Sequence, residues 1–174
     1  WRARLRRALR TEWQHLAAFQ ASHRRWPMPL AAALATGLPL LVGAALGDAA
    51  AGLVGSLGGL VFLYLPGTPM HHRMVTLMAC GFAMTACYAL GLGVQALDVA
   101  GLRAPLIALL ALAVLVVLMA VRYYRLPPPG PIFFVMAAAI GAYTPVPFEL
   151  LPMQVGVLFL GVLGATLIAF GYSL

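Results

Sequence analysis

The sequence has no lysine and only four acidic residues among its 174 positions, although it carries eleven arginines. Charged residues make up 9% of the chain, against roughly a quarter in soluble globular proteins, and hydrophobic residues make up 63%. This scarcity of charge excludes an ordinary soluble domain. The net charge of +7 would suit nucleic acid, but the arginines gather in a terminal arm and in breaks between apolar runs. Their placement indicates membrane orientation and contact with anionic lipids instead of nucleic acid.

Residues for metal binding and catalysis are also scarce. Cys80 and Cys87 lie seven residues apart in one apolar run, which predicts two small buried side chains on one helical face. No second pair with metal-ligand spacing exists, and no phosphate-binding loop, paired carboxylates or catalytic triad is recognisable. We therefore expect no metal, no other cofactor and no enzymatic activity.

Long apolar runs are what the sequence has in abundance. A helix needs about 17–25 such residues to cross a bilayer, and none of the runs alternates as a strand would. The sequence predicts an all-α, polytopic membrane protein with six transmembrane helices, of which the second, fourth and fifth are short. The expected spans are residues 29–47, 49–65, 74–94, 105–121, 131–146 and 153–172.

The charges between these runs predict the orientation. Acidic and basic breaks alternate, as the positive-inside rule produces in a chain that crosses a membrane repeatedly. With both termini in the cytoplasm, ten of the eleven arginines lie inside and three of the four acids outside. The inner breaks hold Arg73, Arg122 and Arg125, and the outer breaks hold Asp48, Asp98, Arg103 and Glu149.

Two regions follow from this pattern: an arginine-rich arm over residues 1–26 and a transmembrane domain over residues 27–174. In the arm, apolar residues and tryptophans recur at helical spacing opposite Arg2, Arg6 and Arg10. We expect an amphipathic helix on the cytoplasmic face of the membrane, with a solvated linker as the alternative.

Small residues and one proline mark places where helices are expected to touch or bend. Gly43 with Gly47, and Gly55 with Gly59, form small-xxx-small steps typical of close helix packing in lipid, and Gly161 with Gly164 marks the sixth span. Pro39 stands in mid-span and predicts a kink. The kink would serve either packing or a transport path.

The two inner breaks hold the candidate binding residues. In the first, Arg73 and His72 would contact an anion or lipid headgroups, and His71 or His72 would titrate near neutral pH. In the second, Arg122 and Arg125 flank two tyrosines ahead of a proline-rich stretch. Guanidinium groups bind carboxylates and tyrosine rings contact aromatic groups, so this break would receive an aromatic acid, with an interfacial anchor as the alternative. The ring contacts are assigned to Tyr123, Tyr124 or Tyr143.

Three stretches together resemble the fusaric acid resistance (FUSC) family of aromatic acid exporters. They are TGLPLLVG from Thr36, GGLVFLYLP from Gly58 and RYYRLPPPG from Arg122, and the resemblance covers residues 24–174. It implies a six-span bacterial inner-membrane domain that exports aromatic carboxylates, with a periplasmic adaptor in some members. It also implies a further cytoplasmic domain, so we expect the chain to be part of a longer protein.

The function expected is efflux of organic anions across the bacterial inner membrane, with aromatic carboxylic acids as the expected substrates. A passive anion channel and a non-transporting membrane anchor or assembly module remain the alternatives. The small-residue faces also suit self-association, which makes a homodimer the expected assembly.

Overall fold

Every regular element of the described chain is a helix, which confirms the all-α prediction. The computed structural model describes residues 27–64, 70–97, 101–124 and 131–173. Its elements are α2 (Pro27–Ala45), α3 (Ala49–Gly59), the 3-10 helix η1 (Leu60–Leu63), α4 (Met70–Ala96), α5 (Arg103–Tyr123), α6 (Ile132–Tyr143), the 3-10 helix η2 (Phe148–Leu150) and α7 (Leu151–Ser173). The arm over residues 1–26 lies outside the described residues.

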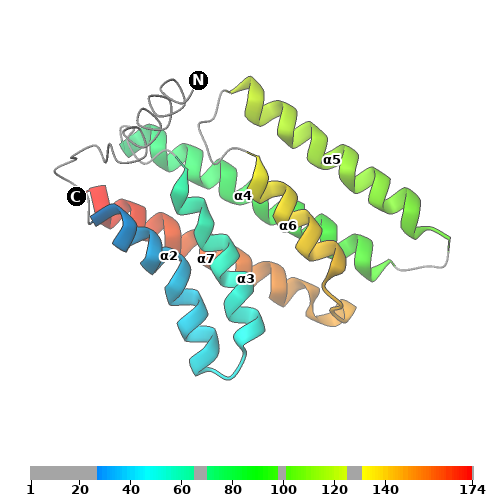
Figure 1. Ribbon diagram of the computed structural model, residues 1–174, viewed down its shortest axis with the longest axis horizontal. Coiled ribbons are helices and arrows are strands. Elements are labelled where there is room, and N and C mark those ends of the chain that lie inside the picture. The colour runs from blue at the N-terminus through cyan, green and yellow to red at the C-terminus, as the bar shows by residue number, and fades with distance from the viewer. Residues whose placement is uncertain (1–26, 65–69, 98–100, 125–130, 174) are drawn as a thin grey trace, which may run out of the picture.

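Successive helices run in opposite directions, as Figure 1 shows. The start of α4 and the end of α5 therefore lie at one end of the bundle, together with Arg73 and Arg122. The turn between α2 and α3, with Asp48, and the helix η2, with Glu149, lie at the other end. The described charges thus separate between the two ends in the way the alternating breaks predict.

Within the described residues, four helices are long and apolar enough to cross a membrane: α2, α4, α5 and α7. The other two apolar segments, Ala49–Leu63 and Ile132–Tyr143, are shorter. At a rise of 1.5 Å per residue, twelve residues extend about 18 Å, less than the roughly 30 Å of a hydrocarbon core. The expectation of six complete spans therefore stays a prediction.

A tight turn joins α2 to α3. Gly47 adopts φ 80°, a left-handed conformation that L-residues with a side chain rarely adopt. The carboxylate of Asp48 then accepts a hydrogen bond of 2.9 Å from the backbone N–H of Ala51 and caps α3. Its spacing from Gly43 predicted a helix contact, but Gly47 instead forms the turn. Gly43 does pack closely, since a Cβ there would meet the backbone of Gly52.

Replacing Asp48 with alanine should lower the free energy of unfolding by about 0.5–2 kcal/mol, because the first turn of α3 loses its side-chain acceptor. Asp48→Asn keeps an acceptor at the same position and should retain most of the stability. Unfolding of the purified protein in mixed micelles, followed by circular dichroism, measures both variants. Equal stability of wild type and Asp48→Ala would contradict the capping role.

The core forms where α4 and α7 cross and the two short helices pack against them. In the described chain α4 packs mainly against α6, while α3 packs against α2 and α7. Cys80 and Cys87 are buried in this core and form no disulfide, as expected of small apolar side chains. Of the sixth-span glycines, Gly161 packs against Gly55, but Gly164 has open space around it and makes no close contact.

Helix α5 lies at the edge of the bundle. It is the most apolar of the four long helices, with a mean hydropathy of 3.0, yet only 17% of that stretch is buried. Its buried side chains are Leu110, Val114 and Val121. An apolar helix that leaves most of its surface uncovered is suited to contact with lipid tails.

Candidate functional site

The first turn of α4 carries the residues that the sequence placed in a loop. Because α4 begins at Met70, His71, His72 and Arg73 are helical, which corrects the expected helix start at residue 74. His71 and His72 are exposed, whereas Arg73 is only 4% exposed. A helix allows this difference because neighbouring side chains point about 100° apart.

Arg73 is packed against an aromatic residue of another element. Its guanidinium carbon lies 5.2 Å from the ring centroid of Phe62, which belongs to η1 and is fully buried. At this distance the ring face attracts the cation, and more strongly where water is excluded. The arginine is thereby held in the core and not extended towards solvent.

Tyr64, two residues after Phe62, contacts two further aromatic rings, and we call these four residues the aromatic cluster: Phe62, Tyr64, Phe133 and Phe134. Tyr64 follows η1 and is fully buried. Its ring centroid lies 6.2 Å from that of Phe133 and 6.0 Å from that of Phe134, both at the start of α6. The rings are tilted or edge-to-face, an arrangement favoured between aromatic side chains. The cluster therefore brings η1 and α6 together beside the start of α4.

The electrostatics at this point favour an anion. The N-terminal end of a long helix carries partial positive charge from its free backbone N–H groups, and Arg73 adds a full charge in the first turn of the 27-residue α4. Charge interactions are stronger at a buried site than in water. A guanidinium next to aromatic rings is chemically suited to a ligand that has both a carboxylate and an aromatic ring.

The arginine–tyrosine motif of the second inner break forms a separate, exposed group. Arg122 and Tyr123 occupy the last turn of α5, where a loop was expected, and Tyr124 follows them. The rings of Tyr123 and Tyr124 lie 5.3 Å apart, edge to face, and both are largely exposed. Arg125 lies outside the described residues. This motif shares its end of the bundle with Arg73 but adds no buried side chain to the aromatic cluster.

Tyr143 lies away from the aromatic cluster. It is the last residue of α6 and is 70% exposed, whereas Phe134 is near the start of the same helix. Nine residues of helix separate them by about 14 Å. The structure therefore does not bring Tyr143 together with Arg73.

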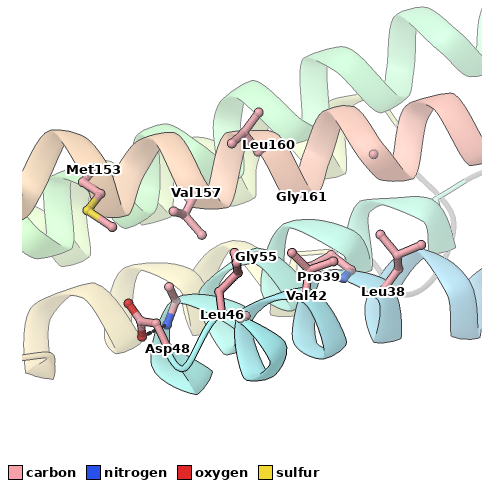
Figure 2. A pocket seen from close by; sticks show the side chains of 14 residues that line it. Leu38, Pro39, Val42, Leu46, Asp48, Gly55, Met153, Val157, Leu160 and Gly161 are labelled. Carbon is pink, nitrogen blue, oxygen red and sulfur yellow. Dashed lines mark hydrogen bonds between the residues drawn. The ribbon is translucent and has the colours of Figure 1, made fainter.

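Pro39 lines a groove of a different kind. A cavity of about 460 Å³ lies between α2, α3 and α7. Figure 2 shows Pro39 and Val42 on one side, Met153 and Val157 on the other, and Asp48 at one end. Helix α2 continues through Pro39 from Pro27 to Ala45. Since the groove is apolar and its one charged side chain is an acid, it is unsuited to binding an anion.

Sequence reasoning identified Arg73 but missed Phe62, Phe133 and Phe134. Each phenylalanine lies in an apolar run, where it is indistinguishable from a lipid-facing residue. Their position was a usable signal. Phe62 with Tyr64, and Phe133 with Phe134, stand at the ends of apolar runs that adjoin the basic breaks. Within the described residues, no group of three His, Cys, Asp or Glu side chains is placed to hold a metal ion.

Comparison with known proteins supports a membrane protein. The chain is 28% identical over 136 residues to a protein of Bacillus subtilis (strain 168) described as the uncharacterized membrane protein YvaC. The match covers 78% of this chain but 21% of the relative, so the chain spans about a fifth of that protein's length. No protein-family model matches the chain, and no solved structure matches it significantly. The resemblance to the FUSC family therefore stays a prediction.

Proposed function

We propose that this membrane protein transports organic anions, with aromatic carboxylates as the substrate class, out of the cytoplasm through a six-helix domain with both termini inside. The observation that carries the proposal is the burial of Arg73 beside the aromatic cluster. Charged side chains within apolar helices are costly and commonly mark a substrate path. Transport is therefore assigned to the region between α4, η1 and α6.

The substrate class follows from the two kinds of side chain at this site. A carboxylate entering from the cytoplasm would meet the positive start of α4 and then the guanidinium of Arg73. Its aromatic ring would replace contacts with water by contacts with the rings of Phe62 and Phe134. An aliphatic carboxylate would gain the first interaction but less of the second, so aromatic acids should be preferred.

The membrane potential would supply a driving force for outward movement. With the cytoplasm negative, each elementary charge leaving as an anion gains about 2.3 kcal/mol per 100 mV. In the described residues the two carboxylates, Asp48 and Glu149, are exposed at the end of the bundle opposite Arg73. This favours the passive channel as the second candidate. For a proton-coupled exporter, His71 and His72, which precede Arg73 on α4, are the residues we propose as proton carriers.

The two arginines of the second inner break should act on the rate of entry. Replacing Arg122 and Arg125 together by alanine removes two positive charges from the inner end, and we expect release of an aromatic acid from vesicles to slow several-fold at low salt. The difference should shrink in about 0.5 M salt, because screening shortens the reach of exposed charges. A loss that persists unchanged at high salt would contradict this steering role.

An assay in sealed vesicles distinguishes transport from the anchoring alternative. Purified protein is reconstituted around a labelled aromatic carboxylate, and its release is compared with that from protein-free vesicles. Faster release supports transport. Retention equal to that of protein-free vesicles, by protein shown to be folded, would favour a non-transporting anchor module. Release that continues when the proton gradient is collapsed would favour the channel over the proton-coupled exporter.

A further inference from the structure

The six described helices fall into two halves with the same pattern of lengths. Helices α2, α3 with η1, and α4 form a long, short, long series, and α5, α6 and α7 form another. In both halves the short helix is followed by a Tyr-X-Pro sequence, at Tyr64 and at Tyr143. Each half holds three helices, and successive helices run in opposite directions. The second half therefore starts at the opposite end of the bundle, and the two halves are inverted relative to each other.

The short helix of each half packs against the last helix of the other half, and it does so through the same contact. Gly58 of α3 lies against α7, and Gly141 of α6 lies against α4. At each glycine an added Cβ would meet the carbonyl oxygen of one residue and the nitrogen of the residue four positions later. These residues are Leu158 and Val162 for Gly58, and Tyr88 and Leu92 for Gly141. One packing arrangement is thus used twice.

The two last helices, α4 and α7, cross at the centre in opposite directions (Figure 1), with Gly81 against Val162. Thr85 and Thr166 each donate a 2.8 Å hydrogen bond to the carbonyl four residues earlier. When these threonines are aligned, all six buried positions of α7 coincide with buried positions of α4. They are 158, 161, 162, 165, 166 and 169 on α7, and 77, 80, 81, 84, 85 and 88 on α4.

The halves are not in identical arrangements. Helix α2 packs closely on α3, whereas its counterpart α5 packs loosely on α6. Gly91 has the same place in the contact of Gly141 that Gly161 has in the contact of Gly58. In the threonine alignment, however, Gly161 matches Cys80. The contact on α4 therefore lies eleven residues, or about three turns, further along the helix than the contact on α7. Transporters built from inverted repeats alternate access largely by rigid-body rocking of one part against the other.

From these observations we propose that the chain consists of two inverted three-helix repeats that exchange their last helices. The two packed units, α2 with α3 and α7, and α4 with α5 and α6, rock against each other about the crossing of Gly81 and Val162. The aromatic cluster lies between these units, because Phe62 and Tyr64 follow α3, and Phe133 and Phe134 belong to α6. Rocking opens this site to one side of the membrane and then to the other. The transport step rests on the function proposed above, whereas the rocking itself does not.

Distances between spin labels on α4 and α7 test the rocking. Cysteines introduced at Val75 and Leu167 lie on one side of the crossing, and cysteines at Leu90 and Met153 lie on the other; all four side chains are exposed. Cys80→Ala and Cys87→Ala remove the native thiols. Each labelled pair is measured in lipid by pulsed electron paramagnetic resonance, with and without benzoate.

Rocking about the crossing predicts two distance populations for each pair. The long population of one pair should gain weight whenever that of the other loses it, and benzoate should shift both. One unchanged distance for each pair, in protein that still releases the acid from vesicles, would overturn the proposal and leave a rigid channel. Opposed shifts in protein that releases no acid would support the rocking and contradict the transport function.

Discussion

Replacing Arg73 with glutamine should slow release of an aromatic carboxylate from vesicles by about ten- to one-hundred-fold. A hydrogen bond to a charged partner is worth about 1.5–3 kcal/mol, and 1.4 kcal/mol corresponds to a factor of ten. Glutamine keeps a polar, although shorter, side chain and removes the charge that lies over Phe62. The expected loss is therefore one of anion recognition.

Two further variants separate recognition from folding. Arg73→Lys keeps the charge but loses the planar group that stacks on Phe62, so it should recover part of the rate. Arg103→Gln removes an exposed arginine at the opposite end of the bundle and should leave the rate within about twofold, because this charge lies more than a screening length from the inner entry. Equal rates for wild type and Arg73→Gln, with Arg73→Gln correctly folded, would exclude Arg73 from the path.

The second large effect is expected at the two equivalent glycines. Gly58→Ala and Gly141→Ala should each lower the free energy of unfolding by about 1–3 kcal/mol, the usual cost of overpacking a well-packed interior. The added methyl would meet main-chain atoms of α7 or α4, which cannot turn aside as a flexible side chain could. Unfolding in mixed micelles, followed by circular dichroism, measures the change.

Gly156→Ala and Gly164→Ala are matched controls on α7. A Cβ at either position has nothing within 4 Å, so these variants should be as stable as the wild type or slightly more stable, since alanine favours helix. If Gly58→Ala were as stable as Gly164→Ala, the close packing of α3 on α7 would be wrong. Clearly unequal losses at Gly58 and Gly141 would argue against the equivalence of the two contacts.

The existence of the helices could be predicted because an apolar run of sufficient length leaves the backbone few alternatives in a membrane. Their limits were less predictable. The charge pattern predicts a start of α4 at residue 74, because the polar residues His71, His72 and Arg73 are typical of a loop between two membrane spans. The first turn of a helix tolerates polar side chains, and a buried aromatic partner holds Arg73 in place. That partner belongs to another element, so local sequence does not reveal it.

The site was predicted in part. Charge and position singled out Arg73, but the companions assigned to it, Tyr123 and Tyr143, are exposed elsewhere. Its aromatic neighbour Phe62 belongs to η1, and the aromatic cluster joins Tyr64 to rings of α6 about 70 residues away in the sequence. Their meeting depends on how closely Gly58 and Gly141 allow the short helices to pack, which is a property of the folded bundle. Neither hydropathy nor charge spacing contains that information.

The most direct measurement of the proposed transport is release of benzoate, and of acetate as an aliphatic control, from sealed vesicles at pH 8 under an imposed potential. Protein-free vesicles give the background for each acid. We expect the protein to accelerate release of benzoate more than that of acetate, to a degree that grows with the negative potential inside, and we expect Arg73→Gln to lose most of the acceleration. Folded wild-type protein that releases benzoate no faster than protein-free vesicles would contradict the proposed transport.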